Sequence, residues 1–390
     1  MRNKMRLGDI ATLITKGTTP TSVGYTFTDT GVNFVKIESI REDGTFIPDK
    51  FAHISDECNT KLKRSQLQEN DILFSIAGAI GRTAIVTKDC LPANTNQALA
   101  IIRIPQGVID YRFLLYALQS DAIIEQAEKQ KQGVAQLNLS LQNINDFEIP
   151  FFTEEEQLTV VEILSSVDSL LSTRIAQLEQ LDELVKSRFI ELFGGADYPK
   201  VLFENVCVFL RNGASIKQTK DAGGYPITRI ETLSNDVFNI DRLGYADITD
   251  LEKYQSYVLH NGDILISHIN SVAYLGRAVQ YRGQLDTPII HGMNLLCARI
   301  ADSYNPTYIE WFFKTPMAKE YISTITKKAV NQASITTSDL KKMQVPNPPK
   351  NLQDQFAAFV EQTDKSKLAV QQSLENLETL KKSLMQKYFG

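Results

Sequence analysis

The chain of 390 residues has few cysteines and histidines and no long apolar run. Its four cysteines lie far apart, without a CxxC pair and without a histidine at ligand spacing, so neither a disulfide framework nor a zinc site is predicted. We expect reduced thiols, a cytoplasmic location, and no metal or other cofactor. No apolar stretch is long enough to cross a membrane, and the segment MRNKMRLGDI lacks the apolar region of a signal peptide. The sequence therefore predicts no membrane partner.

The motifs of common catalytic sites are also missing. No nucleophile stands in a recognisable elbow near the four histidines, and no GxxxxGK[ST] loop is present. Asn347-Pro348-Pro349 resembles the motif with which adenine N6-methyltransferases hold a flipped base, but Lys350 stands where an aromatic ring has to stack. The nearest glycine-rich candidate for a cofactor loop, at 193–196, closes a helical segment instead of opening one. We therefore predict no catalytic residues.

What the sequence does contain is an internal repeat with an offset of about 196 residues. The matches occur in the same order in both copies, which is more informative than any single match. Where the second copy has Asn-Pro-Pro, the first has Phe-Phe-Thr, so we interpret these prolines as the end of a strand before a helix. The matched segments are VKIESI (35–40) with TRIETL (228–233), NDILFSIAGAIGRTAIV (70–86) with GDILISHINSVAYLGRAV (262–279), LAIIRI (99–104) with LLCARI (295–300), FEIPFFTEEEQ (147–157) with MQVPNPPKNLQDQ (343–355), and SRFIELFG (187–194) with SLMQKYFG (383–390).

Each copy ends in a segment of about 40 residues, 154–193 or 351–390, without Pro and, before Gly390, without Gly. Apolar residues spaced by three or four predict a long amphipathic helix of about 60 Å in each. The preceding parts show short apolar runs typical of strands and one helical stretch each, at 111–131 and 306–327. We expect the long helices to pack along a seam formed by Leu171, Ile175, Leu178, Val370, Leu374 and Leu377.

These patterns predict an α+β protein with a pseudo-two-fold internal repeat. Residues 1–150 and 196–350 are expected to form two similar α/β domains, separated by two long antiparallel, coiled-coil-like helices at 151–195 and 351–390. Only seven residues, 194–200, connect the first helix to the second domain. The predicted arrangement, with one domain at each end of a two-helix spacer, lets a single chain imitate a symmetric dimer.

The net charge of −5 does not exclude nucleic acid as a partner. Residues 154–193 carry nine acidic and three basic side chains, so much of the acidity lies in one segment. Basic residues can still gather on one face of each larger segment.

The chain resembles the specificity subunit of Type I restriction–modification systems over essentially its whole length. The resemblance rests on LGDIATLITKGTTP (7–20), DILFSIAGAIGR with its second copy, strand-exit prolines followed by Gln157 and Gln355 at helix starts, and the Phe-Gly that ends both helices. It implies a non-catalytic subunit with two target recognition domains, each reading one half of a bipartite, asymmetric double-stranded DNA site. It also implies that the helices dock two methylation subunits, which restriction subunits then join.

DNA recognition needs Lys or Arg for phosphates and Asn, Gln, Arg or His for base edges. The loop from Ser75 to Gly81 is three residues shorter than the loop from Ser267 to Gly276, as expected for loops that read different sequences. Solvated loop residues without a DNA role are the alternative interpretation for each candidate, and Arg103 and Arg299 inside apolar strands are interpreted as structural. The DNA-binding candidates are Lys36, Gly78, Arg82, Asn94, Asn96 and Gln97 in the first copy, and Arg229, His268, Asn270, Tyr274, Arg277 and Asn294 in the second.

Two other functions stay open at this point. One is a degenerate adenine-N6 DNA methyltransferase, which would bind S-adenosylmethionine. The other is a coiled-coil scaffold without a DNA role, which would lack affinity for DNA phosphates at low salt. Neither explains why two similar, loop-rich domains alternate with two long helices.

Overall fold

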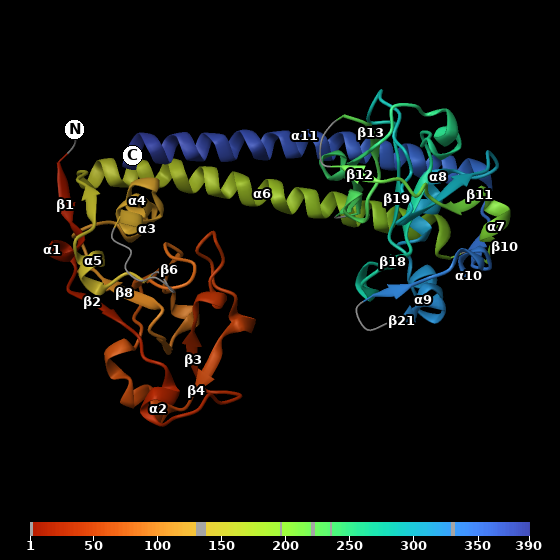
Figure 1. The fold of residues 1–390 in the computed structure, drawn as a ribbon. Coiled ribbons are helices and arrows are strands. Elements are labelled where there is room, and N and C mark those ends of the chain that lie inside the picture. The colour runs from red at the N-terminus through yellow and green to blue at the C-terminus, as the bar shows by residue number, and fades with distance from the viewer. Residues whose placement is uncertain (1–2, 130–137, 196, 220–222, 235, 329–331) are drawn as a thin grey trace. The chain divides into compact units, whose positions relative to one another are not determined.

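The computed structural model describes residues 3–129, 138–195, 197–219, 223–234, 236–328 and 332–390. They form two compact units: unit 1 joins Met1–Ile175 to Gln372–Gly390, and unit 2 is Ala176–Gln371. The helix α6 (Glu154–Phe193) begins in unit 1 and ends in unit 2, whereas α11 (Lys350–Phe389) begins in unit 2 and ends in unit 1 (Figure 1). Both long helices predicted from the sequence are confirmed. Each unit therefore consists of a globular part and two paired helix halves.

An antiparallel sheet in the order β2-β8-β5-β6 forms the centre of unit 1. Successive residues of a strand point to opposite faces, so Ile72 and Phe74 of β5 enter one apolar cluster and Leu73 enters another, with Val35 and Ala93. Burial on both faces accounts for the unbroken apolar run in this strand. The elements are β1 (Lys4–Arg6), α1 (Leu7–Ile10), β2 (Leu13–Lys16), β3 (Val32–Val35), β4 (Ala52–Ile54), α2 (Asp56–Lys61), β5 (Ile72–Ser75), β6 (Thr83–Ile85), β7 (Ala93–Thr95), β8 (Leu99–Arg103), α3 (Tyr111–Gln119), α4 (Asp121–Lys129), α5 (Leu141–Asn145) and β9 (Glu148–Pro150).

Unit 2 repeats this sheet in the order β11-β20-β17-β19. Its strand β17 is buried on both faces like β5, with Ile264 and Ile266 in one apolar cluster and Leu265 in another. The elements are β10 (Lys200–Leu202), α7 (Phe203–Val206), β11 (Cys207–Asn212), β12 (Gln218–Thr219), β13 (Tyr225–Ile227), β14 (Leu233–Ser234), β15 (Val237–Phe238), β16 (Gly244–Ala246), β17 (Ile264–Ser267), β18 (Ile269–Asn270), β19 (Ala278–Gln280), β20 (Leu295–Ile300), α8 (Pro306–Phe312), α9 (Pro316–Ile325), β21 (Lys327–Lys328), β22 (Ala333–Ser334), α10 (Thr337–Lys341) and β23 (Gln344–Pro346).

A buried ion pair occurs at the same place in both sheets. Arg103 donates from Nε and Nη2 to the two carboxylate oxygens of Asp71, each at 2.7 Å. Arg299 makes the same pair of bonds to Asp263, each at 2.8 Å. Hydrogen bonding to aspartate raises the pKa of both guanidinium groups, and both carboxylates are almost fully buried. The structural interpretation of both arginines is confirmed.

The helical stretches predicted at 111–131 and 306–327 are each broken into two shorter helices. Ser120 adopts an extended conformation between α3 and α4. Thr315 separates α8 from α9, where its hydroxyl accepts from the backbone N–H of Ala318 and Pro316 occupies the first turn. Ser and Thr satisfy the free amide groups at helix starts, so these residues begin a second helix instead of continuing the first.

The long helices pack antiparallel within each unit. In unit 1, Asp168 pairs with Lys381 at 2.6 Å, and the Nε of Arg174 lies 3.2 Å from the Ser373 hydroxyl. In unit 2, Lys367 lies 2.6 Å from Asp182. The predicted seam residues Leu171, Leu178, Leu374 and Leu377 are half-buried, Val370 is 7% exposed, and Ile175 differs because it is 50% exposed.

A buried glutamine fixes the start of each long helix to its globular part. The side chain of Gln157 accepts from the Asp110 amide at 2.9 Å and donates to the Phe152 carbonyl at 2.9 Å. Gln353 makes the equivalent bonds to the Asn305 amide and the Pro348 carbonyl, also at 2.9 Å. The counterpart of Gln157 is therefore Gln353, 196 positions later, and not the Gln355 that the sequence suggested, because only Gln353 points inward.

Removing this glutamine should destabilise its unit strongly. Gln353 is fully buried, and Gln353→Ala leaves the amide of Asn305 and the carbonyl of Pro348 without a partner. We expect a loss of roughly 2–5 kcal/mol, because two buried polar groups lose their hydrogen bonds. Urea denaturation measures it, with the exposed Gln355→Ala as the matched control. Equal midpoints for the two variants would contradict this role.

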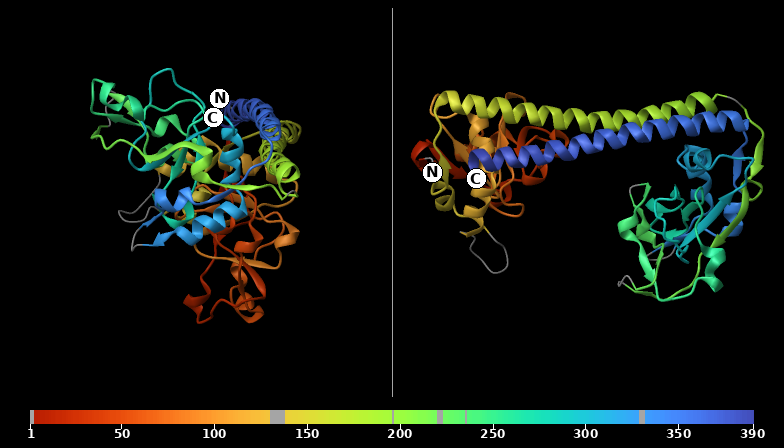
Figure 2. Two further views of the ribbon diagram at one scale, coloured as in Figure 1. Left: turned by 90° about the vertical axis from the view of Figure 1, so that its right-hand side faces the viewer. Right: turned by 90° about the horizontal axis from the view of Figure 1, so that it is seen from above.

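The end of each long helix completes the core of the unit in which it terminates. In unit 1, the ring of Phe389 lies 5.2 Å from that of Phe113 and 6.4 Å from that of Phe152. In unit 2, Phe193 packs 4.8 Å from Tyr308 and 5.7 Å from Phe356. Figure 2 shows the end of α11 beside the start of α6 in unit 1. The terminal Phe-Gly motifs are therefore core anchors.

Candidate nucleic-acid interface

In unit 1, the loop after β2 packs directly against the segment that precedes β8. In unit 2, the loop after β11 packs against the segment that precedes β20 in the same way. A Cβ atom on Gly17 would lie 1.9 Å from the Thr95 carbonyl oxygen, and one on Gly213 would lie 2.2 Å from that of Gly292. Only glycine permits this approach. The Thr19 hydroxyl also donates to the Gln97 side chain. The GTTP motif and the predicted Asn96-Gln97 pair thus form one surface in unit 1.

Several sequence candidates lie on accessible loops. Gln97 and Gly78 are exposed, and Tyr274 is 48% exposed. Gly78 has a φ of +73°, which favours glycine for conformational reasons. The remaining accessible candidates are partly buried: Lys36, Asn96, Asn270 and Asn294.

Arg82 and Arg277 hold equivalent turns in the two units. The Nη1 of Arg82 donates to the Ile40 carbonyl at 3.0 Å, and that of Arg277 donates to the Leu233 carbonyl at 3.1 Å. Arg277 also lies 2.9 Å from the carboxylate of Asp236. Both guanidinium groups are therefore engaged within the fold, where each fixes the turn next to its Gly-Arg motif.

Asn94 and Arg229 also have partners within the fold. Asn94 is fully buried, accepts from the Ser65 hydroxyl at 2.7 Å and donates to the Asn59 side chain at 2.9 Å. Arg229 donates from Nε to the Gln218 side chain at 2.7 Å. These contacts account for both polar side chains without DNA.

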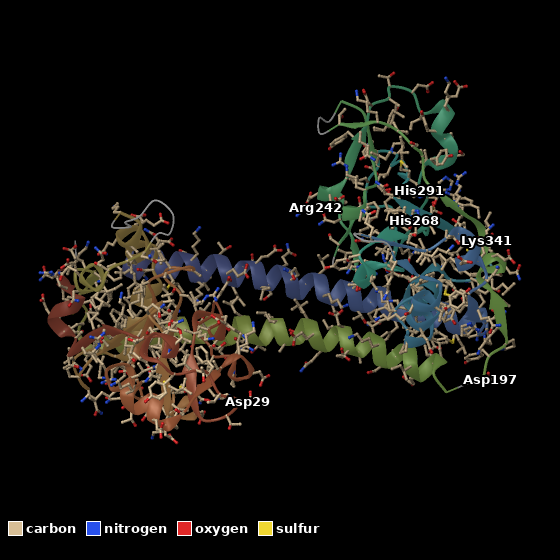
Figure 3. The ribbon with its side chains drawn as sticks, turned by 60° about the horizontal axis from the view of Figure 1, so that its bottom comes forward. Asp29, Asp197, Arg242, His268, His291 and Lys341 are labelled. Atoms are coloured by element: carbon tan, nitrogen blue, oxygen red, sulfur yellow. The ribbon has the colours of Figure 1, made fainter. Side chains whose placement is uncertain are left out.

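Two buried histidines lie beneath the loops of unit 2 (Figure 3). Burial lowers the pKa of His268, whose Nδ1 has no hydrogen-bond partner among the described residues. Burial lowers the pKa of His291 to about 4, although its Nε2 donates to the Leu295 carbonyl at 2.8 Å. Both rings are therefore neutral at physiological pH.

His291 should make unit 2 sensitive to acid. Its pKa is about 4 in the fold and about 6.5 when unfolded, so protons bind preferentially to the unfolded state between these values. Stability is present above pH 6.5 and is lost as the pH falls toward 4, by on the order of 3 kcal/mol. Urea denaturation of His291→Gln should show a weaker pH dependence over that range, whereas exposed His260→Gln should match the parent. An unchanged slope in His291→Gln would refute this assignment.

The longer loop of unit 2 is supported by a strand pair. β18 pairs antiparallel with β22. Beyond it, Val272 and Tyr274 are 55% and 48% exposed, and the Arg277 guanidinium lies 4.8 Å from the Tyr274 ring centroid. The tip of this loop is therefore apolar and aromatic, whereas the shorter loop of unit 1 presents Gly78 and Ala79.

Some exposed basic residues were missed by the sequence analysis. Lys61, Lys63 and Arg64 have no acidic partner among the described residues of unit 1 and suit phosphate contacts. The run KLKR at 61–64 was the available signal. Exposed Arg242 ends a short 3-10 helix of unit 2, Ile240–Arg242 (Figure 3).

The prolines at 346–349 serve the fold. The Pro346 carbonyl accepts from the Tyr308 hydroxyl at 2.8 Å, and the Pro348 carbonyl accepts from Gln353. The backbone N–H of Asn347 donates to the Pro199 carbonyl at 2.8 Å. Asn-Pro-Pro therefore joins a strand end to the start of α11, as interpreted from the repeat.

Within the described ranges, no helix is both long and apolar enough to cross a membrane. Those residues also contain no cluster of three or more His, Cys, Asp or Glu side chains that could hold a metal ion.

Residues 2–180 and 200–379 each match the model of the Type I restriction modification DNA specificity domain. The chain belongs to this family. The two matches correspond to the two copies of the repeat, each consisting of a globular part and most of one long helix. The α+β fold and the resemblance predicted from the sequence are confirmed.

Curated specificity subunits are similar to this family member. A Methanocaldococcus jannaschii protein named as the MjaX specificity subunit of a type I restriction enzyme is 37% identical over 187 residues, 48% of this chain. The type I restriction enzyme EcoKI specificity subunit of Escherichia coli is 24% identical over 314 residues, 73% of this chain. The matched regions span 44% and 66% of the lengths of these relatives.

Two solved structures share the fold of this specificity-domain chain. One is a chain of a type I R-M system, 19% identical, with a TM-score of 0.59 over 99% of this chain and 97% of that one. The other is the S subunit of a type I restriction–modification system from M. genitalium, 15% identical, with a TM-score of 0.53 over 100% and 96%.

Proposed function

We propose that this chain is the non-catalytic specificity subunit of a Type I restriction–modification complex in the cytoplasm. Residues 1–150 and 196–350 each read one half of a bipartite, asymmetric double-stranded DNA site. The helices at 151–195 and 351–390 dock two methylation subunits, and restriction subunits join through them. The central support is that one sheet topology carries two different sets of loops.

Differences between equivalent loops support two different half-sites. Unit 1 offers Gln97 beside the GTTP loop, and the position 196 residues later is Met293, which is 49% exposed. An amide can bond a base edge bidentately, whereas an apolar side chain contacts a thymine methyl group. The adjacent loop has Gly78 in unit 1 and Tyr274 in unit 2. Two domains with the same sheet but different side chains at equivalent loop positions fit a DNA site whose two halves differ in sequence.

The alternatives are less well supported. A degenerate methyltransferase would use Asn347-Pro348-Pro349 to hold a base, but backbone groups of this segment bond within the fold. A scaffold without a DNA role offers no reason for the accessible polar loops of both units.

The test is co-expression with a methylation subunit, followed by mapping of methyladenine in the host DNA. We expect a bipartite, asymmetric motif, and the isolated chain should neither transfer methyl groups nor bind S-adenosylmethionine. A continuous motif, or methylation by the chain alone, would overturn the proposal.

Single loop variants should affect one half-site each. Gln97→Ala should relax one position of the first half-site by roughly 1–3 kcal/mol, since a base-reading amide is lost, while Tyr274→Ala should affect only the second. Methyladenine mapping measures both, and Glu179→Gln on α6 serves as the control. If Gln97→Ala altered both half-sites, independent reading by the two domains would be wrong.

A further inference from the structure

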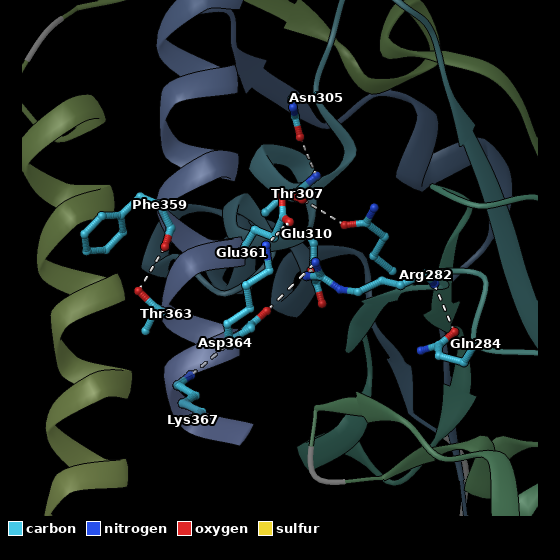
Figure 4. A network of polar contacts seen from close by, with 12 residues as sticks. Arg282, Gln284, Asn305, Thr307, Glu310, Phe359, Glu361, Thr363, Asp364 and Lys367 are labelled. Carbon is cyan, nitrogen blue, oxygen red and sulfur yellow. Dashed lines mark hydrogen bonds and ion pairs between the residues drawn. The ribbon is translucent and has the colours of Figure 1, made fainter. Parts of the chain in front are cut away.

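Unit 2 contains a cavity of about 860 Å³ between its globular part and its two helix halves. Its walls come from residues 182–190 of α6, residues 360–367 of α11, the helices α8 and α9, and the segments 236–238 and 273–284. Figure 4 shows one wall, where Arg282 lies between Glu310 of α8 and Asp364 of α11. Neither DNA reading by the loops nor packing of the long helices accounts for this recess.

The lining is more basic than acidic, although the chain as a whole is acidic. Six basic and four acidic side chains face the cavity. Each acid already has a basic partner in the lining, and Lys319 has no ion pair among the described residues. Lys314 lies over the Trp311 ring, 4.4 Å from its centroid. The acid–base pairs are Asp182 with Lys367 at 2.6 Å, Asp236 with Arg277 at 2.9 Å, Glu310 with Arg282 at 3.1 Å, and Asp364 with Arg282 at 3.9 Å.

The rim of the cavity is apolar and accessible. Ile190 of α6 is 66% exposed and Val237 of β15 is 55% exposed, and both line the recess. The rings of Phe189 and Trp311, which are less exposed, also line the cavity. An apolar side chain can therefore be buried here beside the two lysines.

The corresponding place in unit 1 is lined differently. Ala278 and Lys314 line the cavity of unit 2, and their counterparts in unit 1 are Thr83 and Gln119. There the Gln119 side chain donates to the Thr83 hydroxyl at 2.9 Å, and Gly44 lies against both residues. Unit 1 therefore does not reproduce this lining, and its own hollow beside Arg82 is lined instead by residues such as Glu42, Asp43 and Lys50.

We propose that the cavity receives a segment of the methylation subunit in which carboxylates flank an apolar side chain. The carboxylates pair with Lys314 and Lys319, and the apolar side chain packs against Ile190 and Val237. Four acids and several aromatic rings in the lining disfavour a DNA backbone, which places phosphates on open basic surfaces. This inference rests on the proposed function.

The two units then offer unequal docking sites. At unit 2, a methylation subunit contacts both the helix halves and the cavity. At unit 1, it contacts the helix halves without an equivalent cavity. The first methylation subunit therefore binds at unit 2, and a complex with one methylation subunit holds it there.

The test uses the full chain co-expressed with the methylation subunit, without DNA. Lys314→Glu/Lys319→Glu should weaken binding at unit 2 at least tenfold, so native mass spectrometry at limiting concentration shows complexes with one methylation subunit instead of two. The matched control, Lys253→Glu/Lys328→Glu, reverses two exposed lysines of unit 2 outside the cavity and should assemble like the parent. Ile190→Asp should reproduce the loss through the apolar rim, and far-UV circular dichroism checks that each variant is folded.

The outcomes separate the two proposals. Normal assembly of both cavity variants would overturn the cavity inference, even where the parent complex methylates a bipartite site. Normal assembly with weaker DNA binding and a salt slope reduced by about two would assign the cavity to phosphates and also overturn it. Failure of the parent chain itself to bind methylation subunits would instead refute the proposed function.

Discussion

Phe389→Ala is expected to unfold unit 1 at markedly lower denaturant concentration than the parent chain. The Phe389 side chain is 4% exposed and packs against Phe113 and Phe152 in the core of unit 1. Truncating it leaves a cavity that the surrounding rings cannot fill, which costs about 3–5 kcal/mol. The loss should be large although the change lies at the last turn of α11, where substitutions are ordinarily tolerated.

The single tryptophan allows the two units to be distinguished. Trp311 is partly buried and packs against the core of unit 2, so its fluorescence follows that unit, whereas far-UV circular dichroism follows both. In Phe389→Ala, the dichroism transition should begin before the fluorescence transition. Phe193→Ala should instead shift the fluorescence transition, and exposed Lys382→Ala should change neither. A Phe389→Ala variant that unfolds like Lys382→Ala would show that α11 does not complete the core of unit 1.

The second large effect concerns the unread spacer between the two half-sites, if the helices set the distance between recognition domains. Four extra residues lengthen a helix by about 6 Å and rotate the attached domain by roughly 40°. One or two base pairs add about 3.4–6.8 Å of length and roughly 34–69° of right-handed twist to DNA. The translation and the rotation added by four helical residues lie within these ranges and have the same handedness. The preferred spacer should therefore grow by one or two base pairs while both half-site sequences stay the same.

The ion pairs show that both helices have to be lengthened. Asp168 pairs with Lys381 in unit 1 and Asp182 with Lys367 in unit 2, so an insertion in α6 alone shifts the register on one side. Four residues between Ser172 and Thr173 need four more between Asn376 and Leu377, which stand opposite by the register of these two ion pairs. Methyladenine mapping reads the result, and the α6-only insertion is the control for lost pairing. A folded, active double insertion with an unchanged spacer would assign the spacing to the methylation subunits.

Much of the fold was predictable because the repeat made weak local signals consistent with each other. The long helices follow from apolar spacing, and the role of Asn-Pro-Pro follows from comparing the two copies. The register of the helix pair was harder, since Ile175 fits the spacing but is half-exposed, whereas Val370 is buried. Spacing of three or four residues defines a stripe but does not say which of its members faces the partner helix.

The candidate DNA contacts were less predictable than the fold. Arg82 and Arg277 looked like loop residues available to phosphates, yet both bond backbone carbonyls of a turn more than 40 residues away. Asn94 looked like a base-reading amide and is fully buried. Polar residue types reveal which side chains can bond DNA, but the tertiary structure decides which of them already have partners.

Each long helix begins in one unit and ends in the core of the other. This exchange also determines the order in which the chain can fold during synthesis. Domains generally fold from the amino terminus as they leave the ribosome. Here unit 2 is one continuous stretch, whereas unit 1 needs residues 372–390, which are made after all of unit 2. The amino-terminal half is thus translated first but completed last, and until then it exposes the site where Phe389 will pack. A nascent chain in this state depends on its own late segment, or on a chaperone, to cover that apolar surface.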